Sequence, residues 1–487
     1  MSNLQQGKGK MTNYRWTIVS MLFLATTVNY LDRQVLSLTW ADFIAPEFGW
    51  TNSDYGTITG LFSLFYAVSM LFAGKFIDWI DTKKGFLWAI GVWSFGAVLH
   101  AFCGIATAGI TAGVWTTSFS GAREAISTVG DISMVVNVSV TLFVFARLVL
   151  ALGEAGNFPA AIKATAEYFP KKDRAYATSI FNSGAQIGAL LAPLTIPFIA
   201  KAWGWEMAFI VIGALGFIWM GFWVFLYHKP EKNKRVNALE LAYINQDEAA
   251  DEAAGAATAV ENAGKKISFK QAFRYKQTWA FAVGKFLTDG VWWFLLFWIP
   301  AYLSSVYQLD STHSAPHVFV VYAISMISVF AAGYFPAWFM KRWNLNPYDG
   351  RMKAMLLFAF FPVLLLLAQP LGGISVWIPV IIIGIAAAAH QSWSANIFTT
   401  VSDMFPKHAV GTITGIGGMA GGIGSLLINQ SSGILFDYTD TTKLKFMGFE
   451  GIESGYFIIF CFCAFAYLIG WFIMKALVPK YKLITDL

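Results

Sequence analysis

The sequence predicts an all-α membrane protein with twelve transmembrane helices in two pseudo-symmetric six-helix bundles. Three observations predict this fold class. Hydrophobic residues make up 57% of the 487 residues and charged residues only 13%, whereas soluble domains carry about 25% charged residues. The mean hydropathy is +0.56. Apolar segments of membrane-spanning length recur along the chain, and one stretch of the first half is repeated in the second.

Twelve apolar segments have the length of about 20 residues that a helix needs to cross a bilayer. They lie near residues 16–37, 55–76, 85–108, 139–163, 175–200, 206–228, 278–303, 316–340, 353–370, 375–402, 411–436 and 455–477.

Two polar stretches interrupt this series. Residues 229–275 are rich in Ala, Glu and Lys and divide the apolar segments six and six. The predicted domains are therefore an N-terminal bundle (1–228), a connector (229–275) and a C-terminal bundle (276–487). Residues 109–138 are too polar to span and predict a long external loop with room for a short surface helix.

The distribution of basic residues predicts the orientation. Lysines and arginines follow the second, fourth, sixth and eighth segments, whereas the alternate loops are acidic or mixed. Basic loops stay in the cytoplasm, so both termini and the connector are predicted to be cytoplasmic.

A repeat links the two halves. Residues 169–191 align with 405–427 at a constant offset, and nine of the 23 positions are identical, including a shared Phe-Pro-Lys turn. Parallel halves of six helices suggest a transporter built by duplication, with its site between the halves near the bilayer midplane.

Charged residues inside apolar segments are the candidate functional groups. Arg147 and Glu154 lie seven residues apart, which places them on nearly the same helix face. A charge at the bilayer centre normally faces a cavity or a partner. The pair is either structural or an anion site with a titratable carboxylate beside it. Arg147 is the better candidate for the anion, because its planar fork allows bidentate pairing.

The turn after the second segment carries Gly74, Asp78, Lys83 and Lys84. It resembles the loop signature of the major facilitator superfamily, in which this loop latches the two halves together on the cytoplasmic side. Trp79 and Asp81 depart from the usual residues. A plain positive-inside loop is the alternative.

Other motifs resemble the anion:cation symporter branch of that superfamily, and the hexuronate and sugar-acid importers in particular. They are Asn29-Tyr-Leu-Asp-Arg33, the Arg147/Glu154 pair, Glu167-Tyr-Phe-Pro170 and Asn182-Ser-Gly-Ala-Gln186-Ile-Gly. The resemblance implies proton-coupled uptake of an organic anion across the bacterial inner membrane, without cofactor, metal or nucleic acid, by a monomer.

The resemblance also implies roles for single residues. Arg33 would contact the substrate carboxylate, Tyr30, Tyr66 and Gln186 would line the site, and Asp32 would join Glu154 in proton coupling. For the tyrosines the alternative is aromatic packing, for Gln186 it is helix–helix hydrogen bonding, and for the Asp32–Arg33 pair it is an interfacial position.

The C-terminal half offers fewer indications. The tenth segment carries a polar run in which Ser392, Trp393 and Asn396 could complete the site, while His390 is expected to be packed. Lys285 and Asp289 are spaced as an internal helix pair, and Trp292 and Trp293 could cover the pocket.

The sequence thus predicts a proton-coupled importer of a sugar acid, with a hexuronate such as glucuronate or galacturonate as the leading substrate. Another organic anion (an aldonate, glucarate or a small carboxylate) is the first alternative, and an anion sensor that transports nothing is the second. An enzyme is not expected, because the sequence lacks a recognisable nucleotide motif, metal cluster or nucleophilic triad.

Overall fold

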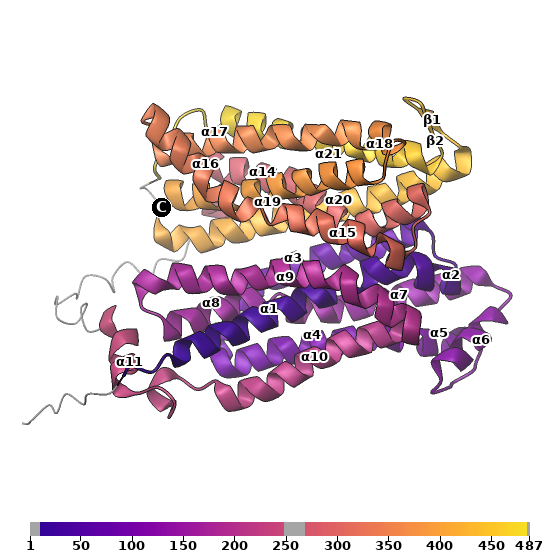
Figure 1. The fold of residues 1–487 in the computed structure, drawn as a ribbon, viewed down its shortest axis with the longest axis horizontal. Coiled ribbons are helices and arrows are strands. Elements are labelled where there is room, and N and C mark those ends of the chain that lie inside the picture. Colours follow the sequence, from indigo (N-terminus) through magenta and orange to yellow (C-terminus); the bar gives the residue numbers. More distant parts are fainter. Residues whose placement is uncertain (1–9, 248–267, 485–487) are drawn as a thin grey trace, which may run out of the picture.

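A computed structural model describes residues 10–247 and 268–484 and consists almost entirely of helices, which form two bundles that lie side by side (Figure 1). The long helices of the N-terminal bundle are α1 (Tyr14–Thr39), α3 (Asn52–Ile80), α4 (Thr82–Ala101) with α5 (Cys103–Thr111), α7 (Ile132–Glu154) with α8 (Asn157–Tyr168), α9 (Lys171–Trp203) and α10 (Trp205–Leu226). Those of the C-terminal bundle are α14 (Lys276–Tyr307), α15 (Ser311–Ser325) with α16 (Ser328–Trp343), α17 (Pro347–Phe360) with α18 (Leu365–Gly372), α19 (Trp377–Met404), α20 (Lys407–Thr442) and α21 (Ile452–Leu477).

Short elements cap the ends of the bundles. They are a π-helical turn (Trp40–Ile44), α2 (Ala45–Phe48), α6 (Phe119–Ser127), α11 (Ala238–Ile244), α13 (Phe269–Ala272), two 3-10 turns (Pro230–Lys232 and Phe361–Leu364) and an antiparallel hairpin of β1 (Lys445–Phe446) and β2 (Phe449–Glu450).

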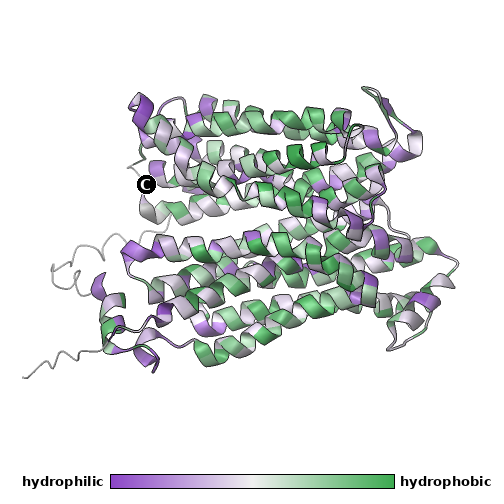
Figure 2. Ribbon diagram, in the orientation of Figure 1, coloured by the Kyte–Doolittle hydropathy of each residue, from purple (hydrophilic) through white to green (hydrophobic). Residues whose placement is uncertain are grey.

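The helices confirm the predicted fold class, and each predicted segment coincides with one of the long helices or helix pairs. In the described part of the chain, ten helical segments are long and apolar enough to cross a membrane, and an eleventh is the pair α4–α5, which is bent by 48°. The remaining segment is α1, which carries Asp32 and Arg33 and is largely buried in the bundle. Hydrophilic residues gather at the two ends of the helices (Figure 2).

The two ends of the molecule differ. We call the end that carries the start of α1, the connector helix α11 and the end of α21 the connector end, and the opposite end, with α6 and the β-hairpin, the loop end (Figure 1). Residues 248–267 of the predicted connector lie outside the described residues. At the loop end the stretch without a spanning helix is shorter than 109–138, because α5 extends to Thr111 and α7 begins at Ile132, where Asp131 accepts the N–H of Met134.

The helix α6 supplies the predicted surface helix and is held to its bundle by one arginine. Arg123 donates to both carboxylate oxygens of Glu206, each at 2.7 Å, and lies 3.2 Å from the carboxylate of Glu47. Both carboxylates are nearly buried. The loop is therefore fixed to α10 and α2 by charge.

The repeated sequence forms the same turn twice. Phe169 and Phe405 are extended residues that end α8 and α19, and Pro170 and Pro406 cap α9 and α20 with nearly identical backbone angles. The missing N–H of proline is no loss at a helix start, where donors are unpaired in any case. The duplicated geometry agrees with the predicted internal repeat.

Glycines allow the central helices to approach closely. A Cβ atom on Gly184 or Gly188 of α9 would lie 2.4 Å from the carbonyl oxygen of Phe23 or Thr27 on α1. The two glycines of the predicted Asn182–Gly188 motif thus let α9 pack directly against the helix that carries Asp32 and Arg33.

Two carboxylates join the bundles at the loop end. Asp437 of α20 accepts the backbone N–H groups of Asn52 and Ser53, at 3.0 and 2.7 Å, and so caps α3 of the other bundle. Asp42 accepts the backbone N–H of Ser311 and so caps α15. Each bundle therefore provides a negative charge for the positive N-terminal end of a helix in the other.

These caps predict how the loop end opens. We expect Asp42→Ala combined with Asp437→Ala to shift the molecule toward an open loop end, because each charged cap contributes about 1–2 kcal/mol, or roughly a five- to thirtyfold change in population. Spin labels at the exposed Ser120 and Met447 would measure the separation of the bundles. Asp440→Ala is the matched control, because Asp440 pairs with its neighbour Lys443. An unchanged distance distribution in the double variant would contradict the assignment.

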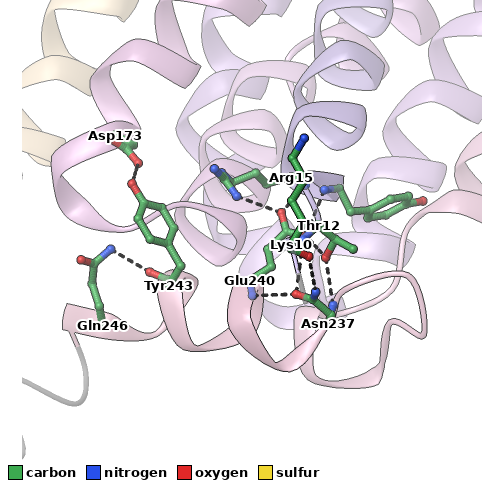
Figure 3. Close-up of polar contacts among 9 residues, drawn as sticks. Lys10, Thr12, Arg15, Asp173, Asn237, Glu240, Tyr243 and Gln246 are labelled. Carbon is green, nitrogen blue, oxygen red and sulfur yellow. Dashed lines mark hydrogen bonds and ion pairs between the residues drawn. The ribbon is translucent and has the colours of Figure 1, made fainter. Parts of the chain in front are cut away.

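At the connector end, α11 binds the starts of two bundle helices (Figure 3). The buried carboxylate of Glu240 accepts the backbone N–H groups of Tyr14 and Arg15, both at 3.0 Å, and pairs with the Arg15 guanidinium at 3.1 Å. Tyr243 donates its hydroxyl to Asp173 at 2.6 Å in the first turn of α9. The start of the connector is therefore part of the N-terminal bundle.

Glu240→Ala is expected to lower the thermal stability of the purified protein by several degrees, because removal of one member of a buried ion pair costs roughly 3–5 kcal/mol. Thermal unfolding in detergent measures the effect, with Glu231→Ala, at an exposed position of the same connector, as the control. If both variants melt like the parent, Glu240 does not hold α1.

Candidate functional site

The candidate site is centred on a buried ion pair between α1 and α7. Arg33 donates from Nε and Nη2 to one carboxylate oxygen of Glu154, at 3.0 and 2.7 Å, and both side chains are almost completely buried. The other carboxylate oxygen has no hydrogen-bond partner in the described structure. The two residues are 121 positions apart in the sequence, and the fold brings together one predicted anion ligand and the predicted proton carrier.

Aromatic rings surround the Arg33 guanidinium on its other sides. Its central carbon lies 4.9 Å from the ring centre of Tyr30, 4.6 Å from that of Tyr66 and 5.2 Å from that of Trp293. Tyr30 and Tyr66 come from α1 and α3, whereas Trp293 comes from α14 of the C-terminal bundle. Rings at this distance stabilise a guanidinium by cation–π attraction. Both bundles therefore supply aromatic rings that stabilise the charge of Arg33.

Arg147 lies in the same region but is not paired. Its side chain is buried, and Nε, Nη1 and Nη2 have no hydrogen-bond partner among the described residues. Phe62 covers the guanidinium at 5.0 Å. Arg147 is near enough to Asp32 and Glu154 to interact with both electrostatically. Buried donors without partners are rare in folded proteins, so this guanidinium is a candidate anion ligand.

Asp32 is the second buried carboxylate. Neither of its oxygens accepts a hydrogen bond in the described structure, and it interacts electrostatically with Glu154 as well as with Arg147. The four charged side chains predicted from the sequence, Asp32, Arg33, Arg147 and Glu154, thus form one buried group of two positive and two negative charges.

The remaining predicted ligands are less closely tied to this group. Gln186 is half-buried on α9. In the C-terminal bundle Trp393 packs edge-on against Tyr467, with ring centres 5.5 Å apart. Asn396 donates to the carbonyl of Ala332 at 2.9 Å, which Pro336 leaves without its helical partner.

These contacts give Trp393 and Asn396 a packing role within their bundle. Ser392, which is also buried, lies on the same helix. A direct contact of these three residues with substrate stays a prediction. His390 is a packed histidine, as expected: it stacks on Trp292 and hydrogen-bonds the Tyr467 hydroxyl at 2.8 Å.

The predicted latch has its described contacts within its own bundle. Asp78 pairs with Lys163 of α8 at 3.1 Å, and Lys83 donates to the carbonyl of Val224 at 2.7 Å. Gly74 lies within α3, where the space around it is open, and Lys84 lies in the first turn of α4. The described hydrogen bonds between the two bundles are those at the loop end. A contact of this turn with the C-terminal bundle therefore stays a prediction for another conformation.

Sequence reasoning did not identify two features of the site. One is the direct pairing of Arg33 with Glu154, since Arg147 was expected beside the carboxylate. The other is Phe62, which covers Arg147. Trp293 was expected only as a cover of the pocket, and its spacing of four residues from Asp289 was the available signal that it faces the interior.

Residues 22–429 match the family model described as Major Facilitator Superfamily, and the chain belongs to this family of membrane transporters. The family confirms the expectation that it is a multi-pass transporter and not an enzyme.

Among curated proteins, the chain is 28% identical over 430 residues to the "Hexuronate transporter" of Escherichia coli (strain K12). The aligned residues cover 88% of this chain and 89% of the relative. It is 27% identical to the "Galacturonate transporter" of Dickeya chrysanthemi, over 69% of this chain and 86% of the relative. It is 26% identical to the "Probable galactarate/D-glucarate transporter GarP" of Escherichia coli (strain K12), over 92% and 94%.

Solved structures agree on the fold. A bacterial homologue of the human lysosomal transporter Spinster, in an inward-facing and unoccupied conformation, superposes with a TM-score of 0.68 at 18% identity and covers 98% of this chain and 99% of its own. A D-xylose–proton symporter gives a TM-score of 0.65 at 15% identity, over 97% and 100%.

Proposed function

We propose that this transporter takes up a sugar acid, with a hexuronate such as glucuronate or galacturonate as the leading substrate, together with protons. The observation that carries the proposal is the buried group of Arg33, Glu154, Arg147 and Asp32 in the N-terminal bundle of a transporter fold, where Trp293 of the other bundle contacts Arg33. Arginine binds carboxylates through paired hydrogen bonds. The relatives named for hexuronate and galacturonate transport support the same class of substrate.

The ion pair suggests how substrate and proton are linked. A carboxylate that binds Arg33 competes with Glu154 for the same donors. Glu154 would then be a buried carboxylate without its partner, a state that favours the protonated form. Substrate and proton therefore bind together and leave together. When Glu154 loses its proton toward the cytoplasm it pairs with Arg33 again and expels the anion.

The proposed orientation places the connector end in the cytoplasm and the loop end outside, in the plasma membrane of a bacterium. It rests on the basic residues at the connector end. With the bundles held together by the caps from Asp42 and Asp437, the conformation described here is closed at the loop end, which faces outward in this orientation. Alternating access would rock one bundle against the other around the central charges.

Uptake into proteoliposomes with an imposed pH gradient, screened against a panel of sugar acids, tests the proposal. We expect hexuronates to accumulate against their gradient. Selective accumulation of an aldonate, an aldarate or a small carboxylate would favour another organic-anion symporter. Tight binding without transport of any member would favour a sensor and would contradict the proposal.

A further inference from the structure

One helix of the C-terminal bundle carries a second charged pair toward the central group. Lys285, Asp289 and Trp293 follow one another at intervals of four residues on α14, so they lie on one helix face, spaced by about 6 Å along the axis. The last of them, Trp293, stacks on Arg33. The face that begins at the proposed carboxylate site therefore continues to a lysine and an aspartate.

The lysine on this face is neutralised. Its Nζ lies 2.6 Å from the Asp289 carboxylate, and the ring of Phe398 covers it at 4.2 Å, which confirms the predicted internal pair. Only 5% of the Lys285 side chain is exposed, against 15% of Asp289. This face therefore offers a ligand an ion pair with no net charge, of which the carboxylate is the more exposed member.

The backbone of α20 is shaped around Asp289. A Cβ atom at Gly421 would lie 2.3 Å from Oδ2 of Asp289, and the neighbouring Gly422 approaches Ala67 of α3 in the other bundle just as closely. The aspartate is therefore held in a fixed position near the boundary between the bundles.

The buried charges limit what a ligand can present here. In the described parts of the chain, the buried arginines and lysines are Arg15, Arg33, Arg147 and Lys285. Glu240 binds Arg15 at the connector end, and Asp289 binds Lys285. Among these buried cations, those of the central group, where Arg147 is unpaired, are therefore the ones that can bind a substrate carboxylate.

We propose that the Lys285–Asp289 pair determines substrate class by excluding a second carboxylate, so that the site accepts sugar monoacids and discriminates against aldarates. This inference rests on the proposed function. A six-carbon acid bound at the central arginines extends along α14, and its far end meets Asp289. A hydroxyl or ring oxygen is compatible with that carboxylate, whereas a second carboxylate is repelled by it. Repulsive elements of this kind are a common basis of specificity.

The proposal predicts the effect of Asp289→Asn on selectivity. The amide keeps the size of the side chain, removes the negative charge and releases Lys285 to bind an anion. In proteoliposomes we expect the ratio of the inhibition constants of glucarate and glucuronate, measured as competitors of labelled glucuronate, to fall by about tenfold or more, because like-charge juxtaposition in a buried site is costly.

Two further variants make the result specific. Asp289→Asn with Lys285→Gln removes both charges, so it should lose the part of the gained glucarate affinity that comes from the released lysine and keep the part that comes from relief of the repulsion. Asp403→Asn, which breaks the similar Arg351–Asp403 pair at 2.7 Å near the connector end, should leave the ratio unchanged.

Transport of glucuronate with an unchanged ratio in Asp289→Asn would overturn the proposal, and so would glucarate as the preferred substrate of the parent. If no sugar acid competes with any other in the parent, the proposed function itself fails.

Discussion

Replacing Arg147 with lysine is expected to reduce sugar-acid uptake about thirtyfold or more, and Arg147→Ala is expected to abolish it. The reason is the proposed pair between Arg147 and the substrate carboxylate, because truncating one partner of a buried hydrogen-bonded charge pair costs about 2–5 kcal/mol. Arg147 is buried with all three guanidinium nitrogens unpaired. Lysine keeps the charge but offers a point donor in place of a planar fork. Initial rates of labelled hexuronate uptake, with the amount of folded protein measured in parallel, give the effect.

Arg33→Lys is the comparison that shows which arginine is the main ligand. Arg33 is already bound to Glu154, so a lysine there should weaken both the ion pair and substrate binding. If Arg147→Lys transports like the parent while Arg33→Lys is inactive, Arg33 is the main carboxylate ligand and Arg147 serves the packing of α7.

Glu154→Gln is expected to retain substrate exchange and lose accumulation driven by a pH gradient. Glutamine fills the same space and still accepts a hydrogen bond from Arg33, but it cannot titrate. Binding should also become less dependent on pH, because one linked proton is gone. Counterflow exchange and gradient-driven uptake measured on the same proteoliposomes separate the two activities.

Asp32→Asn is tested beside it, because Asp32 is the other buried carboxylate of the central group. If Glu154→Gln keeps full gradient-driven accumulation, Glu154 is structural. Loss of accumulation in Asp32→Asn alone would then move the proton site to α1. The account requires that at least one of the two variants separates exchange from accumulation.

The sequence predicted the helices and the repeat because these depend on local composition. A run of about 20 apolar residues has few alternatives to a spanning helix, and the turns at Pro170 and Pro406 carry their own signal. Hydropathy is a weaker signal of a spanning helix for α1, because its charged residues Asp32 and Arg33 face the bundle interior and lower its mean hydropathy. The limits of 109–138 were wider than the structure has them because Ser133 and Asn137 are polar residues within the first turns of α7.

The site was predictable only in its members. Charges in apolar segments pointed to Arg33, Arg147 and Glu154, because such residues seldom face lipid. Which arginine meets the carboxylate depends on how α1 packs against α7, and helical periodicity contains no information on that. The polar run around Asn396 was ambiguous for a related reason: its side chains cannot all face one way.

Proton movement during uptake tests the central claim most directly. Proteoliposomes that contain the parent protein and an internal pH dye, with no imposed gradient, are mixed with a hexuronate. The account predicts that the lumen becomes more acidic as the sugar acid enters, that the acidification requires the hexuronate, and that Glu154→Gln lacks it while still exchanging substrate. Uptake of hexuronate by the parent without acidification of the lumen would contradict proton-coupled symport.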